Sequence, residues 1–553
     1  PVLDDTQSPA LSGVNEDAAQ PVNGNTAGST LVSALTGGVS DIDGDTDIGI
    51  AITATQSSKG TLWYSLNDGD NWQQMGTVSE SSALLLNGDH RLYWQPVSDE
   101  NGSVDNAITF RAMDVNYGGE RGDVRDNGGS YHFSSVSDTA SVFVAEVNDA
   151  PLITNDDIFS LTSTTEDETS SETTVADILA GVNYSEIDSD DKSGIAITSM
   201  TGNGSWQYDA QNDDNWADMP SVAENNALLL NSATKLRYVP DGENAESQVD
   251  LVFKAWDQTV GAASTNGSAQ RIDTTTDGGT TAYSAETATA RLAVSPVNDS
   301  PELDDTQSPA MTAIDEDSAA PATGSLAGAT AVSSLLAGVS DVDQGDEQGI
   351  VISASNTDKG TLWYSRNNGS TWQELTTVAS DNALLLEANG HLYWQPAADE
   401  YGSVDDVITF HAWDQSSGEG GEFVNIGRTS SSDPYSSTSD TVSIVVNNIN
   451  DAPTGTVKLT GGTQAGMRLQ INQDLADKDG LGALSYVWRA DGVVLADQTA
   501  ESLMLAAEHV GKKISATVQY TDEGGKAESV SSVETGAIAA APPPSTGGGS
   551  SGG

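Results

Sequence analysis

A short hinge recurs along the chain and constrains its fold more than any other feature. The sequence Val-Asn-Asp-Ala-Pro at residues 147–151 returns, with one change each time, at residues 297–301 and 449–453. The first copy follows a run of alternating apolar residues at 140–144, which is typical of a β-strand with one buried face. Proline cannot continue such a strand and keeps the preceding residue extended. The hinges therefore divide the chain into tandem units.

Length and composition agree with folded domains in series. A chain of 553 residues is too long for one core and suggests about four domains. Trp, Leu and Val runs recur at fixed places in the repeats, which favours folded modules over a disordered acidic chain. The chain has 82 Asp+Glu against 21 Lys+Arg, a formal net charge of -61, so nucleic acid is not an expected partner. It has no Cys, so disulfides cannot brace the domains.

The order of features within the repeats predicts the domain organisation. Residues 1–10 match residues 301–310 closely, whereas the repeat between them is more diverged. Short strands separated by turn signals indicate antiparallel sandwiches, and the pattern changes after the third hinge to a shorter Ig-like unit. We therefore predict an all-β fold of tandem antiparallel β-sandwich domains in an elongated array. The predicted domains are a first repeat at 1–149, a second at 150–299, a third at 300–451, an Ig-like domain at 452–541 and a flexible Pro/Gly/Ser tail at 542–553.

Acidic turns recur at corresponding places and carry the main chemical signal. Carboxylates at alternate positions of a turn can converge on one cation, and Ca²⁺ accepts six to eight oxygens in irregular geometry. The first turn is not an EF-hand, because Thr46 and Ile52 stand where that loop needs Gly and Glu. A solvated acidic face is the alternative, but repetition favours Ca²⁺. The turn residues are Asp41, Asp43, Asp45, Asp188, Asp190, Asp341, Asp343, Asp477 and Asp479.

Three further groups of oxygen ligands recur with the turns and could complete metal sites. An early Glu-Asp pair opens each long repeat, an aspartate expected to be exposed ends an aromatic strand, and each hinge carries Asn-Asp. Spacing leaves open which of them share one ion. The early acids are Glu16, Asp17, Glu166, Asp167, Glu316 and Asp317; the strand-end acids are Asp114, Asp257 and Asp414; the hinge residues are Asn148, Asp149, Asn298, Asp299, Asn450 and Asp451.

Together these motifs resemble a known family pattern. A strand-end Asp, an Asn-Asp-x-Pro linker, an early Glu-Asp and an Asp-x-Asp turn resemble the linker-calcium pattern of cadherin-like repeats. The three long units resemble those of giant RTX-type adhesins of Gram-negative bacteria, and the fourth, with Ala-Asp-Lys-Asp-Gly-Leu-Gly at 476–482, resembles an Ig-like repeat that accompanies them. The resemblance implies type I secretion, a bacterial cell-surface location and calcium-rigidified tandem domains. The long units exceed a typical Ig-like module, and no RTX nonapeptide array is present.

These observations favour an extender function over three alternatives. We expect a calcium-rigidified segment of a longer extracellular adhesin, without a membrane span, that spaces a distal ligand-binding domain from the cell. The repeats could instead bind glycan or protein ligands through Gly-rich loops and exposed aromatics such as Trp94 and Trp394, or form a surface lattice or filament. An enzyme is not expected, because the five histidines form no HExxH motif and the acids repeat with the modules.

Overall fold

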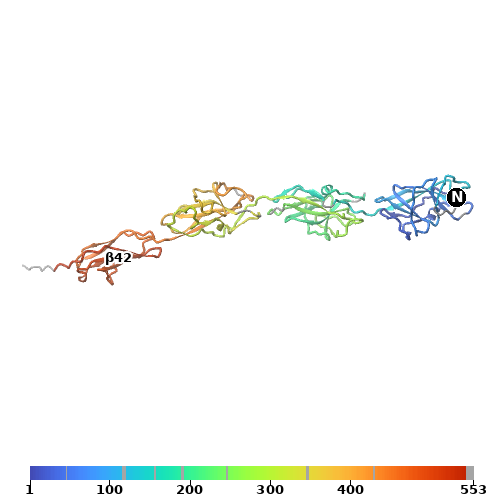
Figure 1. The fold of residues 1–553 in the computed structure, drawn as a ribbon. Coiled ribbons are helices and arrows are strands. Elements are labelled where there is room, and N and C mark those ends of the chain that lie inside the picture. The colour runs from blue at the N-terminus through green and yellow to red at the C-terminus, as the bar shows by residue number, and fades with distance from the viewer. Residues whose placement is uncertain are drawn as a thin grey trace, which may run out of the picture. The chain divides into compact units, whose positions relative to one another are not determined.

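The computed structural model describes residues 1–44, 46–114, 120–154, 157–188, 192–243, 247–343, 345, 348–427 and 430–543. The chain forms two compact units, Pro1–Pro296 and the part from Val297 onward. Within the described ranges the regular structure is β-strand, apart from one short α-helix and three 3-10 helices. The prediction of tandem antiparallel β-sandwich domains is confirmed, and each colour range in Figure 1 forms its own sandwich.

The first repeat is a sandwich of a six-stranded and a four-stranded sheet. The strand orders are β11-β8-β5-β10-β12-β2 and β3-β9-β6-β7, and β1 pairs with β4. All pairs are antiparallel except the short parallel pair of β2 with β12. The elements are β1 (Val2–Leu3), β2 (Val14–Asn15), β3 (Thr30–Leu31), η1 (Val32–Leu35), β4 (Val39–Ser40), β5 (Gly49–Thr55), β6 (Gly60–Ser65), β7 (Gln73–Gln74), β8 (Ala83–Asn87), β9 (Arg91–Pro96), β10 (Gly102–Met113), β11 (Arg121–Gly122) and β12 (Asp138–Ala145).

The Tyr-Trp pair on β9 corrects one expectation from the sequence. Alternation along a strand predicts that one of the two faces solvent, yet Trp94 is 1% exposed and Tyr93 9% exposed. The segment between β2 and β3 covers the face that holds Tyr93, whose hydroxyl donates to the Ala19 carbonyl at 3.1 Å. Trp394 in the third repeat is likewise buried. These tryptophans therefore cannot serve as the exposed aromatics of a glycan-binding surface.

The second repeat keeps the same two sheets despite its diverged sequence. The strand orders are β13-β23-β21-β16-β19-β22 and β15-β20-β17-β18, and β14 pairs with β24. Its short helix α1 begins with a reciprocal cap, because Thr174 and Asp177 each accept a backbone N–H of the other. The elements are β13 (Ile158–Ser160), β14 (Thr164–Thr165), β15 (Thr173–Thr174), α1 (Val175–Ala180), β16 (Gly194–Met200), β17 (Ser205–Asp209), β18 (Ala217–Asp218), β19 (Ala227–Asn231), β20 (Lys235–Val239), β21 (Val249–Trp256), β22 (Arg271–Ile272), β23 (Ala288–Leu292) and β24 (Val294–Ser295).

One position in the long central strand carries a different basic residue in each repeat. On β21, Lys254 is buried and its ammonium contacts Glu224, Asp277 and the Thr274 carbonyl. The first repeat has Arg111 at the corresponding place of β10, where its guanidinium donates to the carbonyls of residues 134 and 135 and to the carboxylate of residue 80. The third has a histidine, residue 411, whose ring nitrogen contacts the carbonyl of residue 436. At this position the repeats thus share the strand but differ in the polar contacts of its side chain.

The third repeat reproduces the first. The strand orders are β26-β36-β34-β29-β32-β35 and β27-β33-β30-β31, and β25 pairs with β28. The elements are β25 (Glu302–Leu303), β26 (Ile314–Asp315), β27 (Thr330–Ala331), η2 (Val332–Leu335), β28 (Val339–Ser340), β29 (Gly349–Ser355), β30 (Gly360–Ser365), β31 (Gln373–Glu374), β32 (Ala383–Glu387), β33 (His391–Pro396), β34 (Gly402–Trp413), β35 (Phe423–Val424) and β36 (Tyr435–Asn447).

The fourth domain is a smaller sandwich of three and four strands, ordered β37-β38-β41 and β40-β39-β42-β43. Trp488 is fully buried in its core between the two sheets, and Figure 1 marks β42 in this domain. The elements are β37 (Val457–Gly461), β38 (Arg468–Gln473), β39 (Ser485–Ala490), β40 (Val493–Val494), β41 (Ser502–Met504), η3 (Ala507–His509), β42 (Ile514–Thr521) and β43 (Ala527–Ser531).

The contact between Gly60 and Trp94 yields a stability prediction. A Cβ on Gly60 would lie 2.5 Å from the Trp94 ring, whereas a Cβ on Gly37 would meet nothing within 4 Å. Overpacking of a core costs about 1–3 kcal/mol. We therefore expect Gly60→Ala to lower the calorimetric melting transition of the first repeat, and Gly37→Ala to leave it nearly unchanged. Equal transitions for both variants would contradict this packing.

Candidate metal centre

Backbone N–H groups of the first hinge, residues 147–151, hold acids from the repeats on both sides. The Val147 N–H donates to Glu16 Oε1 at 2.6 Å, and the Asp149 N–H donates to Asp188 Oδ2 at 2.7 Å. Glu16 follows β2 in the first repeat, and Asp188 lies in the turn before β16 in the second. They are 1% and 6% exposed. Hydrogen bonds offset part of the cost of burying these carboxylates and fix their orientation.

Two overlapping sets of oxygens converge at this hinge. One carboxylate oxygen from each of Glu16, Asp149 and Asp188 lies within 4.8 Å of the others, and the same holds for Asp17, Asp99 and Asp149. Oxygens that bind one Ca²⁺ at about 2.4 Å are separated by at most about 4.8 Å. Asp149 belongs to both sets, so its carboxylate would be a ligand of a cation held by either set.

The amide of Asn148 adds an oxygen that has no donor. Its nitrogen donates to Asp257 Oδ2 at 3.0 Å and to the Thr281 and Asp149 carbonyls, so the nitrogen side of the amide is assigned by three acceptors. The opposite oxygen, Oδ1, is buried and has no hydrogen-bond partner among the described residues, and neither has Asp149 Oδ2. Buried oxygens without donors are costly, and a cation would satisfy them.

The charges at the first hinge repel one another. Burial and the charges of Asp17, Asp188, Asp99 and Glu16 raise the pKa of Asp149 to about 6. Burial and neighbouring acids also raise the pKa of Asp17. A divalent cation would reverse this effect, because an opposite charge favours the ionised carboxylate. The donor set consists of carboxylate and amide oxygens, which suits a hard cation such as Ca²⁺.

The second hinge, residues 297–301, makes the same contacts with acids of the third repeat. The Asp299 N–H donates to Asp343 Oδ2 at 2.8 Å, and Asn298 donates to Asp414 Oδ2 at 3.0 Å. Asp341 lies beside them and accepts the Asp343 N–H at 3.0 Å. The strand-end acids were expected to be exposed, which is wrong for two of them, since residues 257 and 414 are 1% and 2% exposed. The side-chain amides of the hinge asparagines, Asn148 and Asn298, donate to these two carboxylates.

Other predicted residues fall into partial groups. In the first repeat, Asp41 and Asp114 lie together, 3.1 and 3.6 Å from the amino group of Pro1, while Asp43 is exposed. In the second repeat, residue 166 is 2% exposed and residue 167 is exposed. Two predicted ligands, Asp45 and Asp190, lie outside the described residues.

The third hinge, residues 449–453, repeats two of the backbone contacts. The Ile449 N–H donates to Glu316 Oε1 and the Asp451 N–H to Asp479 Oδ2, both at 2.6 Å. The role of Asn148 is not repeated, because Asn450 is exposed and Asn448 instead donates to Asp479 Oδ1 at 2.7 Å. Asp477 accepts the Asp479 N–H at 3.0 Å, and Asp317 is exposed.

Sequence reasoning missed two acids that the fold brings to the hinges. Asp99 and Asp399 follow strands β9 and β33 in turns with positive φ, 61° and 63°. Asp99 joins one of the two oxygen sets at the first hinge, and Asp399 forms an ion pair with Lys478 at 2.7 Å. Their recurrence as Asp-Glu at the same place in the first and third repeats was the available signal.

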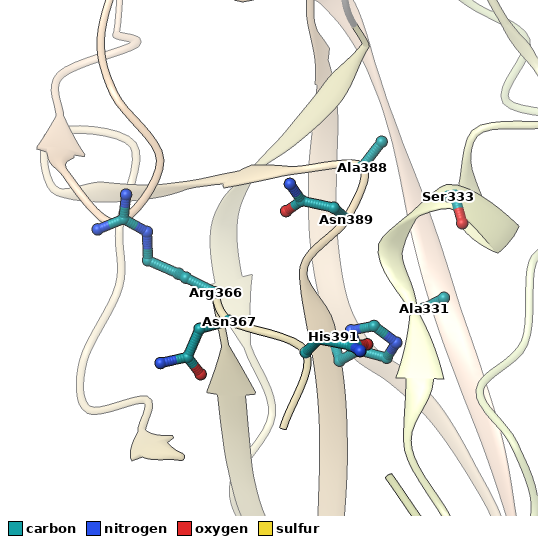
Figure 2. A pocket seen from close by; sticks show the side chains of 8 residues that line it. Ala331, Ser333, Arg366, Asn367, Ala388, Asn389 and His391 are labelled. Atoms are coloured by element: carbon teal, nitrogen blue, oxygen red, sulfur yellow. The ribbon is translucent and has the colours of Figure 1, made fainter. Parts of the chain in front are cut away.

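A polar hollow of about 400 Å³ lies elsewhere in the third repeat (Figure 2). Arg366, Asn389 and His391 contribute to its lining, and the buried His391 Nδ1 has no hydrogen-bond partner among the described residues. The first repeat has leucine, aspartate and arginine at the matching positions 66, 89 and 91. These three side chains that line the hollow therefore differ from those at the matching positions of the first repeat.

The chain is similar to several solved structures at low sequence identity. No family model matches the chain, and no curated protein matches its sequence. The extracellular cadherin domains 1–5 of protocadherin gamma B2 are 13% identical over 96% of this chain and 80% of that one, with a TM-score of 0.40. A Ca²⁺-stabilized adhesin that helps an Antarctic bacterium reach out and bind ice is 11% identical over 90% and 95%, with a TM-score of 0.20. Likeness at these TM-scores carries no argument about what the chain binds.

Helices long and apolar enough to cross a membrane are absent from the described residues.

The raised pKa of Asp149 predicts how stability depends on pH without calcium. The folded-state pKa of Asp149, about 6, exceeds its ordinary value of 3.8. The protonated carboxyl therefore contributes fully to the free energy of unfolding below about pH 4, and this contribution is lost as pH rises through about 6. We expect the melting temperature in metal-free buffer to fall over this range. Saturating Ca²⁺ should remove the fall, because the cation takes the place of the proton.

Asp149→Asn is the matched variant, since it keeps the hinge N–H and removes the charge. It should flatten the pH dependence in metal-free buffer and leave the chain at least as stable as the wild type at pH 7. An unchanged slope in this variant would show that Asp149 is not the group that titrates.

Proposed function

We propose that this chain is a calcium-rigidified extender segment of a bacterial cell-surface adhesin, which spaces a distal ligand-binding domain from the cell. The observation that carries the proposal is the first hinge, where oxygens from two repeats and from the hinge itself converge. There Asn148 Oδ1 and Asp149 Oδ2 are buried and receive no hydrogen bond from any residue that the structure describes. Recurrence of the hinge along the chain supports a function shared by the tandem domains.

The proposed action of calcium follows from where the oxygens originate. Glu16 belongs to the first repeat, Asp188 to the second, and Asp149 to the hinge between them. When bound, Ca²⁺ would supply the positive charge that lets these carboxylates remain ionised and close together. Rotation of one repeat against the other would then break cation contacts, so the bound joint resists bending. Without the cation, repulsion among the same acids favours separation.

The proposed location is the extracellular face of a bacterial cell, reached by type I secretion. Extracellular calcium-binding modules work with dissociation constants of about 10⁻⁴–10⁻³ M, so joints of this kind remain loaded outside the cell. The absence of Cys from the sequence fits a chain that is stabilised by cations in place of disulfides. The proposal assigns no catalytic step to the chain.

Calcium removal tests the proposal directly. An ion that binds only the folded form stabilises it by about 2.7 kcal/mol per site at a hundredfold excess over its dissociation constant. We expect chelation to lower the melting temperature of the full chain. Small-angle scattering in calcium should fit a stiffer chain than scattering in chelator. Melting and scattering that are both indifferent to calcium would overturn the proposal.

Glu16→Gln, with Glu146→Gln as its control, tests the first hinge specifically. Glu16 is buried at the first hinge, whereas Glu146, which directly follows β12, is exposed. Loss of one charged ligand should weaken calcium binding at this hinge by at least about tenfold, while the control should titrate like the wild type. Isothermal titration of the full chain measures both, and equal affinities would contradict the role of Glu16.

A further inference from the structure

The acidic turns of the four domains differ at one position. Each turn has one acid on each side of a middle residue. That residue is Ile42, Ile187 and Val342 in the three repeats but Lys478 in the fourth domain. Ile187 is 39% exposed, so the aliphatic side chain is not required by a core. The lysine therefore places a positive charge within an acidic turn where the repeats have none.

Lys478 pairs with Asp399, the acid that corresponds to Asp99 of the first hinge. Its ammonium is 2.7 Å from Asp399 Oδ1. The hydrogen bond to Asp399 and the charges of Asp399, Asp451 and Asp317 raise the pKa of Lys478. These three acids match Asp99, the hinge aspartate 149 and Asp17, whose oxygens converge within 4.8 Å at the first hinge.

We infer that Lys478 takes the place of one calcium ion at the third hinge, which therefore binds one ion fewer than the first hinge. The inference rests on the proposed function, because it presupposes that calcium occupies the Asp17, Asp99 and Asp149 set. An ammonium tethered to the turn is present at any calcium concentration, whereas a free ion dissociates when calcium falls. The third hinge thus keeps part of its charge compensation after the first hinge has lost its ions.

The lysine does not satisfy the whole hinge. Asp451 Oδ2 remains buried without a hydrogen-bond partner in the part of the chain that the structure describes. Glu316 and Asp479 are each 1% exposed and are held by hinge N–H groups, as their counterparts are at the first hinge. These three acids, Asp451, Glu316 and Asp479, therefore remain available to a cation beside the lysine.

An ordinary surface ion pair is the competing explanation. The side chains of Lys478 and Asp399 are 56% and 33% exposed, and exposed pairs contribute little to stability. The two explanations differ in calcium stoichiometry. A surface pair leaves the number of bound ions unchanged when the lysine is removed, whereas a lysine that occupies a cation place leaves that place open to one more ion.

The test counts calcium ions bound to the full chain, by equilibrium dialysis at saturating calcium, in the wild type and in three variants. Lys478→Ile installs the residue found at position 187 and should bind one ion more than the wild type. Lys478→Arg keeps the charge and should bind the same number. Lys458→Ile removes an exposed charge from β37 of the same domain and should also leave the number unchanged.

The outcomes separate this inference from the proposal on which it rests. A gain of one ion in Lys478→Ile alone supports the inference. A wild type that binds calcium, with the same count in Lys478→Ile, overturns the inference and leaves the extender proposal standing. A gain in Lys458→Ile as well also overturns it, because the effect is then one of net charge. A wild type that binds no calcium overturns both.

Discussion

Negative charge that is buried at the hinges and held there by backbone N–H groups is the constraint on which the rest of the structure depends. The hinge amides of Val147 and Asp149 orient Glu16 and Asp188, but they neutralise no charge. Charges a few ångströms apart repel strongly where water is excluded. A proton on Asp149, an ammonium such as that of Lys478 and a divalent cation are three ways to relieve the same repulsion, and they differ in how readily each leaves.

The sequence predicted what depends on local patterning. Strands with period two and a proline that ends them are local features, so the sandwich class and the hinge motif followed from the sequence alone. The approach of Glu16 to Asp188 is not local, because it needs two complete repeats and the extended hinge between them. Asp99 was missed for the same reason, since it looks like an ordinary loop acid until β9 is placed. Trp94 was misjudged because alternation does not reveal the segment that covers the outer face of its strand.

The hinges share one mechanism for positioning acids but differ in their donor sets. At the first and second hinges an asparagine links the hinge to a buried strand-end aspartate, as Asn148 does with Asp257. In the fourth domain the aspartate that follows β42, Asp522, is also buried, but Asn448 donates to Asp479 of the acidic turn instead. A change of domain type therefore alters the ligands available at a hinge while the backbone contacts to Glu316 and Asp479 persist.

The basic residue on the long central strand, Arg111 in the first repeat and Lys254 in the second, has a consequence for how tandem copies fold. Identical neighbours can exchange strands during folding, and such exchange is a common failure of repeat proteins. The first and third repeats match closely, yet a diverged repeat separates them. If β21 entered the first repeat, Lys254 would leave Glu224 and Asp277 behind and reach a site arranged for the longer guanidinium of Arg111. The diverged second repeat thus makes strand exchange between neighbouring repeats unfavourable during folding.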